Sequence, residues 1–539
     1  MNDHDKQYDV IIVGCGPVGA MLANFVRRYG WKVAIFDREK EIFFAPRAYG
    51  LDDETMRTMQ TLGLARRFQE ENHVYQGKML FCDGDYNILT KFDTDSVGED
   101  LLIGPTGHYY LNFFDQRAME GLLREEFELE DGADAFLGYE VSSVQDSGSQ
   151  VTVQAQNLET QENLTFTAKY VVGCDGGRSL VGKTIGGEAI DWNYREQYLV
   201  IDAIVEDEAY HRTQFPDGGM FVLDSKRPGV IAKGVHGLVR FDFFRPPELI
   251  NSASTDDADY AEEARELITE RGFDADKCAL LRHSPYIFHA RTPKLWRKGR
   301  LLVAGDAAHL TPPWAGQGLN MGVRDSANIA FKLDLVMAGK AHESILDTYQ
   351  QERLPVSLDT IQGAVDMGKL MQRKSALTLA LRNLVFALTR NSRFVIRQFW
   401  KAWLRKPQYK AGLIGKHKLA GALMPQPRLI GAQGESQLMD EFIGLRFALI
   451  TRQEANGPAV DRFQKQLDGV ILTVGKDVHD PEKELTTWFD KVKVDAVMVR
   501  PDRYIFDAGK DGEALCGALF ESLEMDHSIN ASTNSMPRH

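Results

Sequence analysis

Near the N-terminus, an apolar strand pattern leads directly into a glycine-rich turn and then into a helical pattern. The run Tyr8–Val13 is followed by GCGPVG, with glycines at 14, 16 and 19, and then by AMLANFVRR. This order predicts the first unit of a doubly wound α/β domain that binds a dinucleotide. Gly14 permits the tight turn, Gly16 lets backbone approach a pyrophosphate, and Gly19 allows close helix packing. Pro17 belongs to the same predicted binding turn.

The second strand pattern ends in an acidic residue. It is KVAIFD, residues 32–37, and Asp37 stands where a ribose hydroxyl needs an acceptor. We assign Asp37 and its neighbour Arg38 to the dinucleotide-binding set. The glycine motif alone does not separate FAD from NAD(P).

A second glycine-rich segment follows a strand pattern in mid-chain. After the apolar run 300–304 comes GDAAHLTPPWAGQGLNMGVRD, residues 305–325. Asp306 closes the strand and can accept hydrogen bonds from a ribityl chain or a ribose. Pro312 and Pro313 keep the backbone extended, and Gly316 and Gly318 keep side chains away from a flat ring.

The pattern becomes helical from about Leu319. The amides and the positive dipole end of such a helix would point at the flat ring and favour negative charge on a reduced flavin. We therefore add Gly316, Gly318, Leu319 and Asn320 to the predicted cofactor-binding residues. The alternative interpretation is an ordinary glycine-rich loop at the start of a helix.

Composition and charge exclude several classes of function. The chain has 539 residues, is 43% hydrophobic and carries a formal charge of −14, which argues against a nucleic-acid partner. No secretion signal is visible, so a cytoplasmic location is expected. The apolar-rich region 376–388 is too short to span a bilayer and predicts an amphipathic helix, so no membrane partner is expected. The five cysteines are widely spaced and indicate neither a disulfide framework nor a metal site.

Three motifs in this order resemble the FAD-dependent aromatic hydroxylases. They are the turn at 14–19, the segment VVGCDGGRSLVGK at 171–183, and GDAAH with PPWAGQGLNMGVRD. The resemblance is closest to the 3-(3-hydroxyphenyl)propionate hydroxylase branch, which also matches in FHARTPKLWRKGRLLVAGDAAH (288–309) and LDTYQQERLP (346–355). It covers residues 8–360 well and the remainder weakly.

The resemblance implies an α/β fold of three parts. These are a Rossmann-type FAD-binding domain, an inserted antiparallel-sheet substrate domain like that of p-hydroxybenzoate hydroxylase, and a C-terminal thioredoxin-like domain. Period-two runs between residues 195 and 245 independently predict the inserted sheet, and Pro425–Pro427 predicts a linker. The expected boundaries are 1–75, 111–185 and 286–370 for FAD binding, 76–110 and 186–285 for the substrate, 371–427 for a helical connector, 428–524 for the thioredoxin-like domain, and 525–539 for a flexible tail.

The same resemblance assigns further cofactor residues. Arg47 matches an arginine near the flavin and its phosphates, Gln116 a flavin contact, and Val141 a backbone contact on the adenine side. Asp175 belongs to a D-G-x-x-S pattern that helps to hold FAD and to admit NAD(P)H. Gly182 stands where that pattern usually has arginine, so the pyridine-nucleotide assignment has weaker support than the FAD assignment.

The reaction is implied in the same way. NADPH or NADH reduces FAD, O2 adds to give a flavin C4a-hydroperoxide, and its distal oxygen attacks an electron-rich ring. Pro312 is expected beside the reacting ring, and Arg240 is expected to face flavin or substrate, with a solvated strand cation as the alternative. Partners for the phenol stay open among Tyr109, Tyr110 and two histidines, His236 and His289. His309 is expected to serve in a helix or a turn rather than in proton transfer.

The predicted function is therefore hydroxylation of a small phenolic substrate in aromatic-compound catabolism. A polyketide- or antibiotic-modifying flavin hydroxylase is one alternative. A flavin-binding protein without hydroxylase turnover is the other, and a homodimer is left open. The basic run between residues 382 and 418 predicts a solvated or subunit-facing helix, with an acidic or membrane partner as the alternative.

Overall fold

The computed structural model describes residues 7–44, 47–128, 132–246, 260–371 and 392–527, with three single positions (379, 384 and 386) between the last two ranges. The amphipathic helix expected at 376–388 lies almost entirely outside the described residues, as does most of the expected tail. None of the helices in the described ranges is long and apolar enough to cross a membrane.

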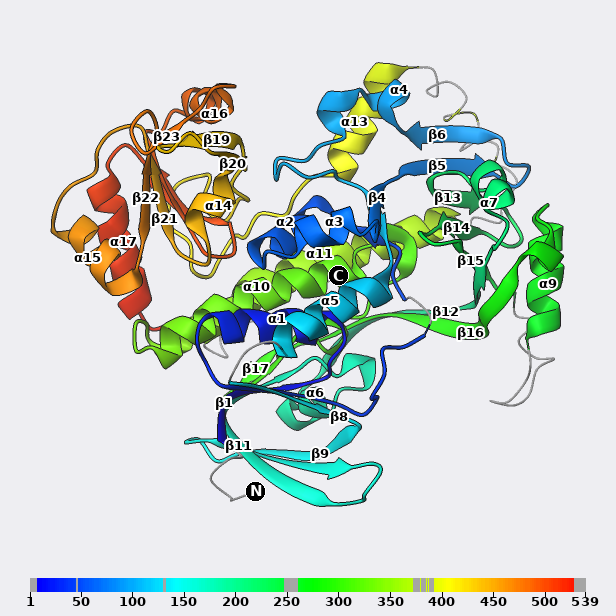
Figure 1. Ribbon diagram of the computed structural model, residues 1–539, viewed down its shortest axis with the longest axis horizontal. Helices are drawn as coiled ribbons and strands as arrows, with labels where there is room; N and C mark the ends of the chain where they lie inside the picture. The colour runs from blue at the N-terminus through cyan, green and yellow to red at the C-terminus, as the bar shows by residue number, and fades with distance from the viewer. Residues whose placement is uncertain are drawn as a thin grey trace.

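The first strand pattern forms the centre of an eight-stranded sheet, in the lower part of Figure 1. β1 (Gln7–Val13) pairs in parallel with β2 (Val33–Asp37) on one side and with β11 (Asn163–Gly173) on the other. Its inner residues are fully buried, as expected for a parallel sheet covered on both faces. The other strands are β8 (Ala133–Leu137), β9 (Tyr139–Asp146), β10 (Val151–Asn157), β17 (Arg297–Lys298) and β18 (Leu301–Val303).

Three long helices cross the middle of the molecule above this sheet (Figure 1). They are α1 (Pro17–Arg28), α10 (Gly318–Met337) and α11 (Asp347–Met371). α1 and α10 pack very closely, because a Cβ at Gly322 would collide with Val18, and Ser326 Oγ donates to the Val18 carbonyl at 2.9 Å. This packing brings together the two glycine-rich segments, which are far apart in the sequence.

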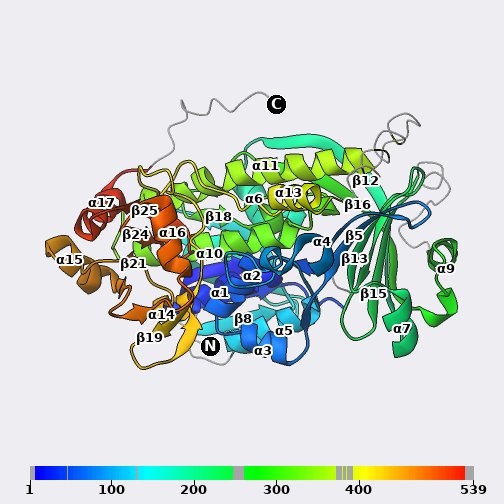
Figure 2. The same ribbon diagram turned by 90° about the horizontal axis from the view of Figure 1, so that it is seen from above.

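A seven-stranded sheet forms the opposite end of the molecule from the C-terminal domain (Figure 2). Its order is β16-β12-β15-β14-β13-β5-β6, antiparallel except for the parallel pair of β5 and β13. One face packs against α7 (Glu208–Gln214) and α9 (Ala261–Glu270). The strands are β5 (Lys78–Asp83), β6 (Ile88–Phe92), β12 (Ala189–Ile204), β13 (Gly218–Leu223), β14 (Gly229–Lys233), β15 (Leu238–Phe244) and β16 (Ala279–Pro293).

The C-terminal domain is built on a four-stranded sheet of order β22-β21-β24-β25. β21 (Ala448–Thr451) and β22 (Val470–Thr473) are parallel, and β24 (Ala496–Val499) and β25 (Ile505–Gly509) add antiparallel strands. The sheet thus ends in the antiparallel pair of β24 and β25, and the thioredoxin-like name stays a prediction. Its other elements are β19 (Arg428–Gly431), β20 (Ser436–Leu438), β23 (Val478–His479), α14 (Met439–Ile443), α15 (Pro458–Leu467), α16 (Glu484–Val492) and α17 (Gly512–Glu524).

The remaining elements lie within and between these three parts. They are α2 (Asp53–Thr61), α3 (Ala65–Glu70), α4 (Thr94–Val97), α5 (Gln116–Glu128), α6 (Leu180–Ile185), α13 (Arg393–Trp403), β3 (Gly50–Leu51), β4 (Val74–Gln76), β7 (Asn112–Phe114) and the 3-10 turns η2 (Glu99–Leu101), η3 (Gly176–Arg178), η4 (Ala275–Lys277), η5 (Gly305–Ala307), η6 (Pro313–Ala315) and η7 (Glu343–Leu346).

The segment Pro425–Pro427 is not a free linker. Gln426 is buried, its backbone N–H donates to the Pro105 carbonyl at 2.6 Å, and its side-chain amide pairs with Gln60. The linker prediction was wrong because prolines stiffen a chain whether or not it is packed. All five cysteines are free thiols.

Candidate active site

The turn between β1 and α1 leaves a helix N-terminus open. Gly14 has a φ of 104°, and a Cβ there would collide with the Cys174 carbonyl. A Cβ at Gly16 would meet no atom within 4 Å, and no side chain caps α1, whose first residue is Pro17. At Gly19 a Cβ would collide with the Gly14 carbonyl. The turn therefore presents uncapped amides and the positive end of the helix dipole, which together suit a phosphate.

Asp37 lies beside this turn at the end of β2. Its Oδ2 accepts from the Cys15 backbone N–H at 2.7 Å, and its Oδ1 accepts from the Glu39 N–H at 2.9 Å. Asp37 thus stiffens the turn while staying only partly buried. Arg38 is largely exposed and pairs with Glu140 at 3.5 Å, and Val141 lies next along β9.

Asp306 follows β18 in η5. Its carboxylate makes no hydrogen bond to any described residue, and its side chain is exposed. Surrounding protein atoms nevertheless displace enough water to raise the pKa of Asp306. His309 and Arg47 act in the opposite direction and lower it, but by less. η5 contacts η3, which follows the end of β11. Asp306 therefore lies at the same edge of the sheet as the turn between β1 and α1.

The loop after η5 ends in a second open helix N-terminus. Pro312 is buried with extended backbone, the 3-10 turn η6 begins at Pro313, and Gly316 is left-handed with a φ of 61°. No side chain caps α10, so the amides of Gly318 and Leu319 are open.

Asn320 shapes this loop with its side chain. Its Oδ1 accepts from the Asp52 N–H at 3.0 Å and from Thr55 Oγ1 at 2.7 Å, and its Nδ2 donates to the Gly316 carbonyl at 2.8 Å. Only the backbone amide of Asn320 is therefore left for a ligand.

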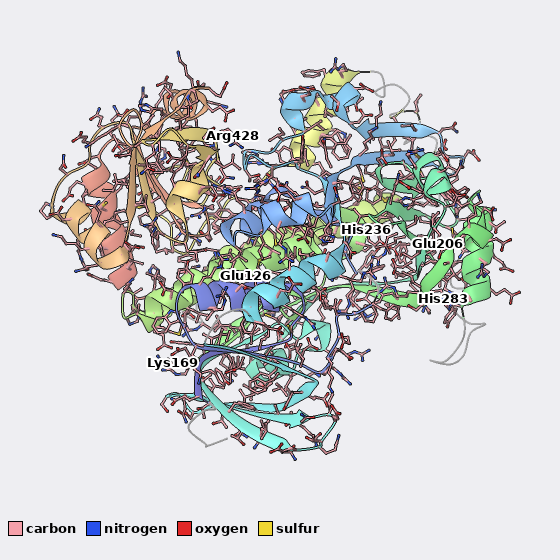
Figure 3. All side chains as sticks on the ribbon, viewed as in Figure 1. Glu126, Lys169, Glu206, His236, His283 and Arg428 are labelled. Atoms are coloured by element: carbon pink, nitrogen blue, oxygen red, sulfur yellow. The ribbon has the colours of Figure 1, made fainter. Side chains whose placement is uncertain are left out.

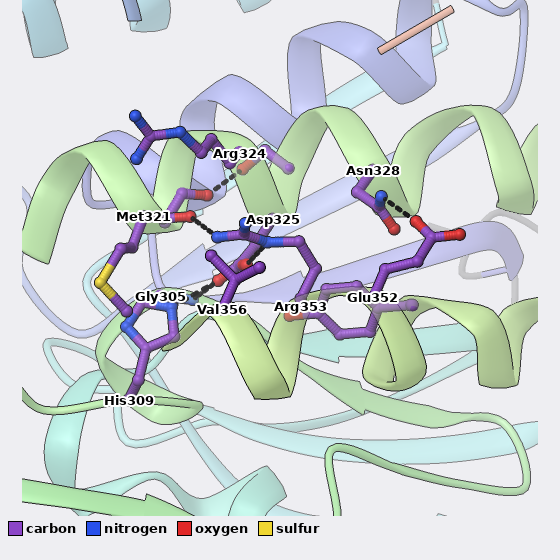
Figure 4. A network of polar contacts seen from close by, with 12 residues as sticks. Gly305, His309, Met321, Arg324, Asp325, Asn328, Glu352, Arg353 and Val356 are labelled. Carbon is purple, nitrogen blue, oxygen red and sulfur yellow. Dashed lines mark hydrogen bonds and ion pairs between the residues drawn. The ribbon is translucent and has the colours of Figure 1, made fainter. Parts of the chain in front are cut away.

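A buried ionic network behind the loop escaped prediction from the sequence (Figure 4). Asp325 Oδ2 accepts from the Gly305 N–H at 3.0 Å and lies 2.7 Å from His309 Nε2, while Arg353 Nε donates to Oδ1 at 2.9 Å. Burial opposes ionisation of Asp325, but His309 and Arg353 outweigh it and lower its pKa. The only signal in the sequence was a charged pair, RD at 324–325, directly after the glycine-rich segment.

Gln116 positions the loop that carries Arg47. Its Oε1 accepts from the backbone N–H groups of Arg47 and Ala48 at 2.7 and 2.6 Å, and its Nε2 donates to Glu120 at 2.7 Å. The Arg47 side chain is exposed. Gln116 thus acts through the backbone of Arg47, while the exposed guanidinium lies 5.1 Å from the centre of the Phe43 ring.

Arg240 joins the seven-stranded sheet to that loop. Its guanidinium donates to Asp202 at 2.8 and 3.2 Å and to the Arg47 carbonyl at 2.8 Å. It lies 4.6 Å from the centre of the Tyr49 ring. The alternative of a solvated strand cation is wrong, because Arg240 is only 6% exposed.

Asp175 caps helix α6. Its Oδ2 accepts from the Leu180 N–H at 2.6 Å, and its buried Oδ1 has no hydrogen-bond partner among the described residues. Ser179 Oγ accepts from the Gly182 N–H at 2.8 Å, and a Cβ at Gly182 would lie 3.2 Å from that oxygen. The family arginine is thus replaced by glycine at a position with little room for a side chain.

The four residues left open as phenol partners come from different elements. Tyr110 lies near Lys406 and Asp53, and burial raises its pKa to about 12, while Tyr109 is exposed. His236 occupies a left-handed turn between β14 and β15, in the part of the molecule built by the seven-stranded sheet (Figure 3). His289 pairs with Arg195 across β12 and β16.

These features fit FAD and give no sign of a metal. Two uncapped helix N-termini suit the pyrophosphate and the flavin ring, and the free oxygens of Asp306 and Asp175 suit hydroxyl or amide donors. No cluster of His, Cys, Asp and Glu within the described residues could hold a metal ion.

The chain matches known families along most of its length. Residues 7–364 match the family described as FAD binding domain, and residues 421–522 match the HcaD C-terminal domain. The chain is 31% identical to a probable NADH-specific resorcinol 4-hydroxylase of Rhodococcus jostii, with 96% of this chain and 94% of that protein covered. It is 30% identical to a 3-(3-hydroxy-phenyl)propionate/3-hydroxycinnamic acid hydroxylase of Mycolicibacterium gilvum, with 96% and 92% covered.

Solved structures share the fold. The flavin-dependent monooxygenase PieE superposes with a TM-score of 0.79 at 22% identity, covering 96% of this chain and 98% of that one. Anhydrotetracycline hydroxylase OxyS from Streptomyces rimosus superposes with a TM-score of 0.73 at 26% identity, covering 94% and 96%. The family match, the relatives and the geometry agree: this chain belongs to the FAD-dependent aromatic hydroxylases, which are flavoprotein monooxygenases.

Proposed function

We propose that this enzyme uses NADH and O2 to hydroxylate a small phenol in aromatic-compound catabolism. One observation carries the proposal. Two uncapped helix N-termini, those of α1 and α10, lie close to the carboxylate of Asp306 at one edge of the eight-stranded sheet. Similarity to a resorcinol hydroxylase and a hydroxyphenylpropionate hydroxylase along 96% of the chain supports the substrate class. The NADH-specific name of the first relative supports NADH over NADPH.

We propose the following roles for the cofactor-binding residues. The turn of α1 binds the pyrophosphate, Asp37 and Arg38 lie at the ribose, and the backbone of Val141 lies at the adenine. Bound FAD supplies the redox chemistry and the activation of oxygen. We assign the contacts with the ribityl chain, the phosphates and the flavin ring to the remaining predicted residues, which are Asp306, Arg47, Gln116, Asp175, Pro313, Gly316, Gly318, Leu319 and Asn320.

Water must be kept from the reacting ring, and the apolar side chains around Pro312 can do this. Trp314 is 1% exposed, and its ring centre lies 5.6 Å from that of Tyr198 and 6.2 Å from that of Phe221. Its Nε1 donates to the hydroxyl of Tyr194 at 2.9 Å, which holds the indole in place. A dry wall of this kind favours transfer of oxygen to the ring over its loss as peroxide.

The test is flavin reduction followed by stopped flow with NADH and NADPH against simple, carboxylate-bearing and polycyclic phenols. Acceleration by one class of simple phenol, with matching oxygen uptake and little peroxide, is expected. Acceleration only by polycyclic phenols would favour an antibiotic-type hydroxylase, and peroxide formation with every phenol would contradict hydroxylation. A homodimer, which the sequence left open, stays a hypothesis.

A further inference from the structure

A carboxyl group lies at the centre of the seven-stranded sheet. Asp242 is on β15, directly opposite Val200 on β12 and Val230 on β14. Its neighbours Phe241 and Phe243 belong to the core on the α7 and α9 side. Because side chains alternate along a strand, Asp242 is on the opposite face, together with Arg240 and Phe244.

This face is the one turned toward the predicted flavin loops. At one end of β15, Arg240 donates to the Arg47 carbonyl. At the other end, the Phe244 ring centre lies 5.8 Å from that of Tyr198, which in turn contacts Trp314 beside Pro312. Asp242 lies between these two contacts, where a ring held between the sheet and the loop would come closest to it.

Asp242 has no hydrogen-bond donor for its buried oxygen. The residue is 9% exposed, and Oδ1 is buried without a hydrogen bond. Arg240 Nε is 3.8 Å away, but this guanidinium donates to Asp202 and to the Arg47 carbonyl. Arg282 also pairs with Asp202, at 2.6 Å. Both arginines are thus directed at Asp202, and Asp242 is left as an acceptor that nothing in the described protein satisfies.

The charge state of Asp242 reflects this position. Burial raises its pKa to about 6, against the attraction of Arg240, while Asp202 raises it further and Arg282 lowers it. The carboxyl group is therefore mostly ionised at neutral pH. A buried carboxylate of this kind gains most from a donor supplied by a ligand.

We propose that Asp242 is a specificity-determining residue that accepts a hydrogen bond from a second hydroxyl group on the substrate ring. The enzyme then prefers uncharged dihydroxybenzenes to aromatic carboxylates, since a second hydroxyl group can donate to Asp242, whereas a substrate carboxylate has no proton to donate at neutral pH. This inference rests on the proposed function and names the substrate class of the same site.

The test measures binding rather than turnover. The FAD-loaded enzyme is titrated without reductant with resorcinol, phenol and 3-(3-hydroxyphenyl)propionate, and the flavin absorbance change gives each Kd. Wild type should bind resorcinol tightest. Asp242→Asn should weaken resorcinol about tenfold, and Asp242→Val by about 10- to 100-fold, as hydrogen bonds to charged acceptors predict. Both variants should bind phenol with nearly the wild-type Kd and should bind the propionate more tightly than wild type does.

Glu206→Gln is the matched control. Glu206 is an exposed carboxylate in the same part of the molecule, directly after the residue that follows β12 (Figure 3). Glu206→Gln removes one negative charge, as Asp242→Asn does. It should nevertheless leave the Kd values of all three ligands unchanged. FAD content, measured from the absorbance ratio of each variant, shows that the cofactor site is intact.

Two results would overturn the inference. One is wild-type enzyme that binds the propionate as tightly as resorcinol, a measurement that needs no variant. The other is an unchanged ratio of resorcinol to phenol Kd in both Asp242 variants. Failure of the proposed function looks different: wild type would bind these ligands in the expected order, yet NADH oxidation would yield peroxide and no hydroxylated product.

Discussion

At the scale of single residues, two carboxylates of the proposed site lack hydrogen-bond donors from the described protein. Asp306 has no hydrogen bond within the described protein, and Asp242 keeps a buried oxygen without one. Elsewhere, buried acids such as Asp202, Asp325 and Glu352 have several donors each. Buried polar groups are normally satisfied, but Glu435 and Asp480 in the C-terminal domain also keep a buried oxygen without a hydrogen bond. An unsatisfied carboxylate therefore supports a ligand only where the surrounding elements also form a site, as they do around Asp306 and Asp242.

Asp306→Ala should weaken FAD binding by about tenfold or more, because the cofactor loses a charged hydrogen-bond acceptor that the protein supplies. FAD occupancy after dialysis, read from the flavin absorbance, measures this. Asp276→Ala, at an exposed turn position, should retain the cofactor as wild type does. Full occupancy in Asp306→Ala would contradict the placement of Asp306 at the ribityl chain.

Asp242→Asn should stabilise the protein at alkaline pH. The folded-state pKa of about 6 is above the ordinary value of 3.8, so folding favours the protonated form. Stability from this group is complete below pH 4 and is lost as the pH rises through 6. Since Asn never ionises, the variant should exceed wild type by up to about 3 kcal/mol at pH 8, with little difference at pH 4. Urea unfolding at both pH values measures this, and equal gains at both would count against a buried ionised carboxyl.

At the scale of elements, the start of α10 is fixed by contacts with α11 and with the first residue of η5. Asp325 on α10 connects the Gly305 amide to Arg353 on α11, and Arg353 Nη2 donates to the Met321 carbonyl at 3.0 Å (Figure 4). The flavin loop therefore depends on the register between two helices. These residues position the loop without facing a ligand themselves.

Asp325→Asn should raise the Kd for FAD about tenfold, because Arg353 loses its charged partner and the Gly305 amide loses its anchor. Fluorescence titration of the apoprotein with FAD measures the change. Asp334→Asn, on the same helix but bonded to Trp31 instead, should bind FAD like wild type. Equal Kd values for both variants would show that the network has no effect on the loop.

At the scale of the whole molecule, buried ion pairs attach the C-terminal domain. Arg500 donates to Glu352 at 2.9 and 2.8 Å, and Lys332 Nζ donates to the same carboxylate at 2.9 Å, with all three residues fully buried. Burial opposes ionisation of Glu352, yet Arg500 and Lys332 lower its pKa to about 2. Helix α11 thus contacts the C-terminal domain at Glu352 and the flavin loop at Arg353.

Glu352→Gln should destabilise the protein by about 3–5 kcal/mol, because two buried cations lose their shared partner. The shift of the urea unfolding transition measures this. Glu524→Gln removes the exposed pair with Arg462 at 2.8 Å and should cost under about 1 kcal/mol. A small shift for both variants would mean that the buried pairs of Glu352 add little to the stability of the protein.

Local patterns in the sequence were enough to predict a dinucleotide site and much of the fold, and the family resemblance identified the dinucleotide as FAD. The strand, glycine turn and helix at residues 8–28, and the second such segment from Arg300, depend on backbone preferences that a short window reveals. Gly14 and Gly316 take the left-handed backbone that glycine permits. The inserted sheet followed from period-two runs, although its pairing with β5 did not.

Only the tertiary structure decided which side chains meet. Arg240 could not be oriented until the register of β12 against β15 was known, because a slip of one residue moves it to the other face. The partners of Asp325 and Glu352 come from helices and domains far along the chain. Asp242 Oδ1 lacks a hydrogen bond because both nearby arginines donate to Asp202 instead. Backbone conformation is governed mainly by neighbouring residues, whereas charge pairing depends on distances through space that no local pattern contains.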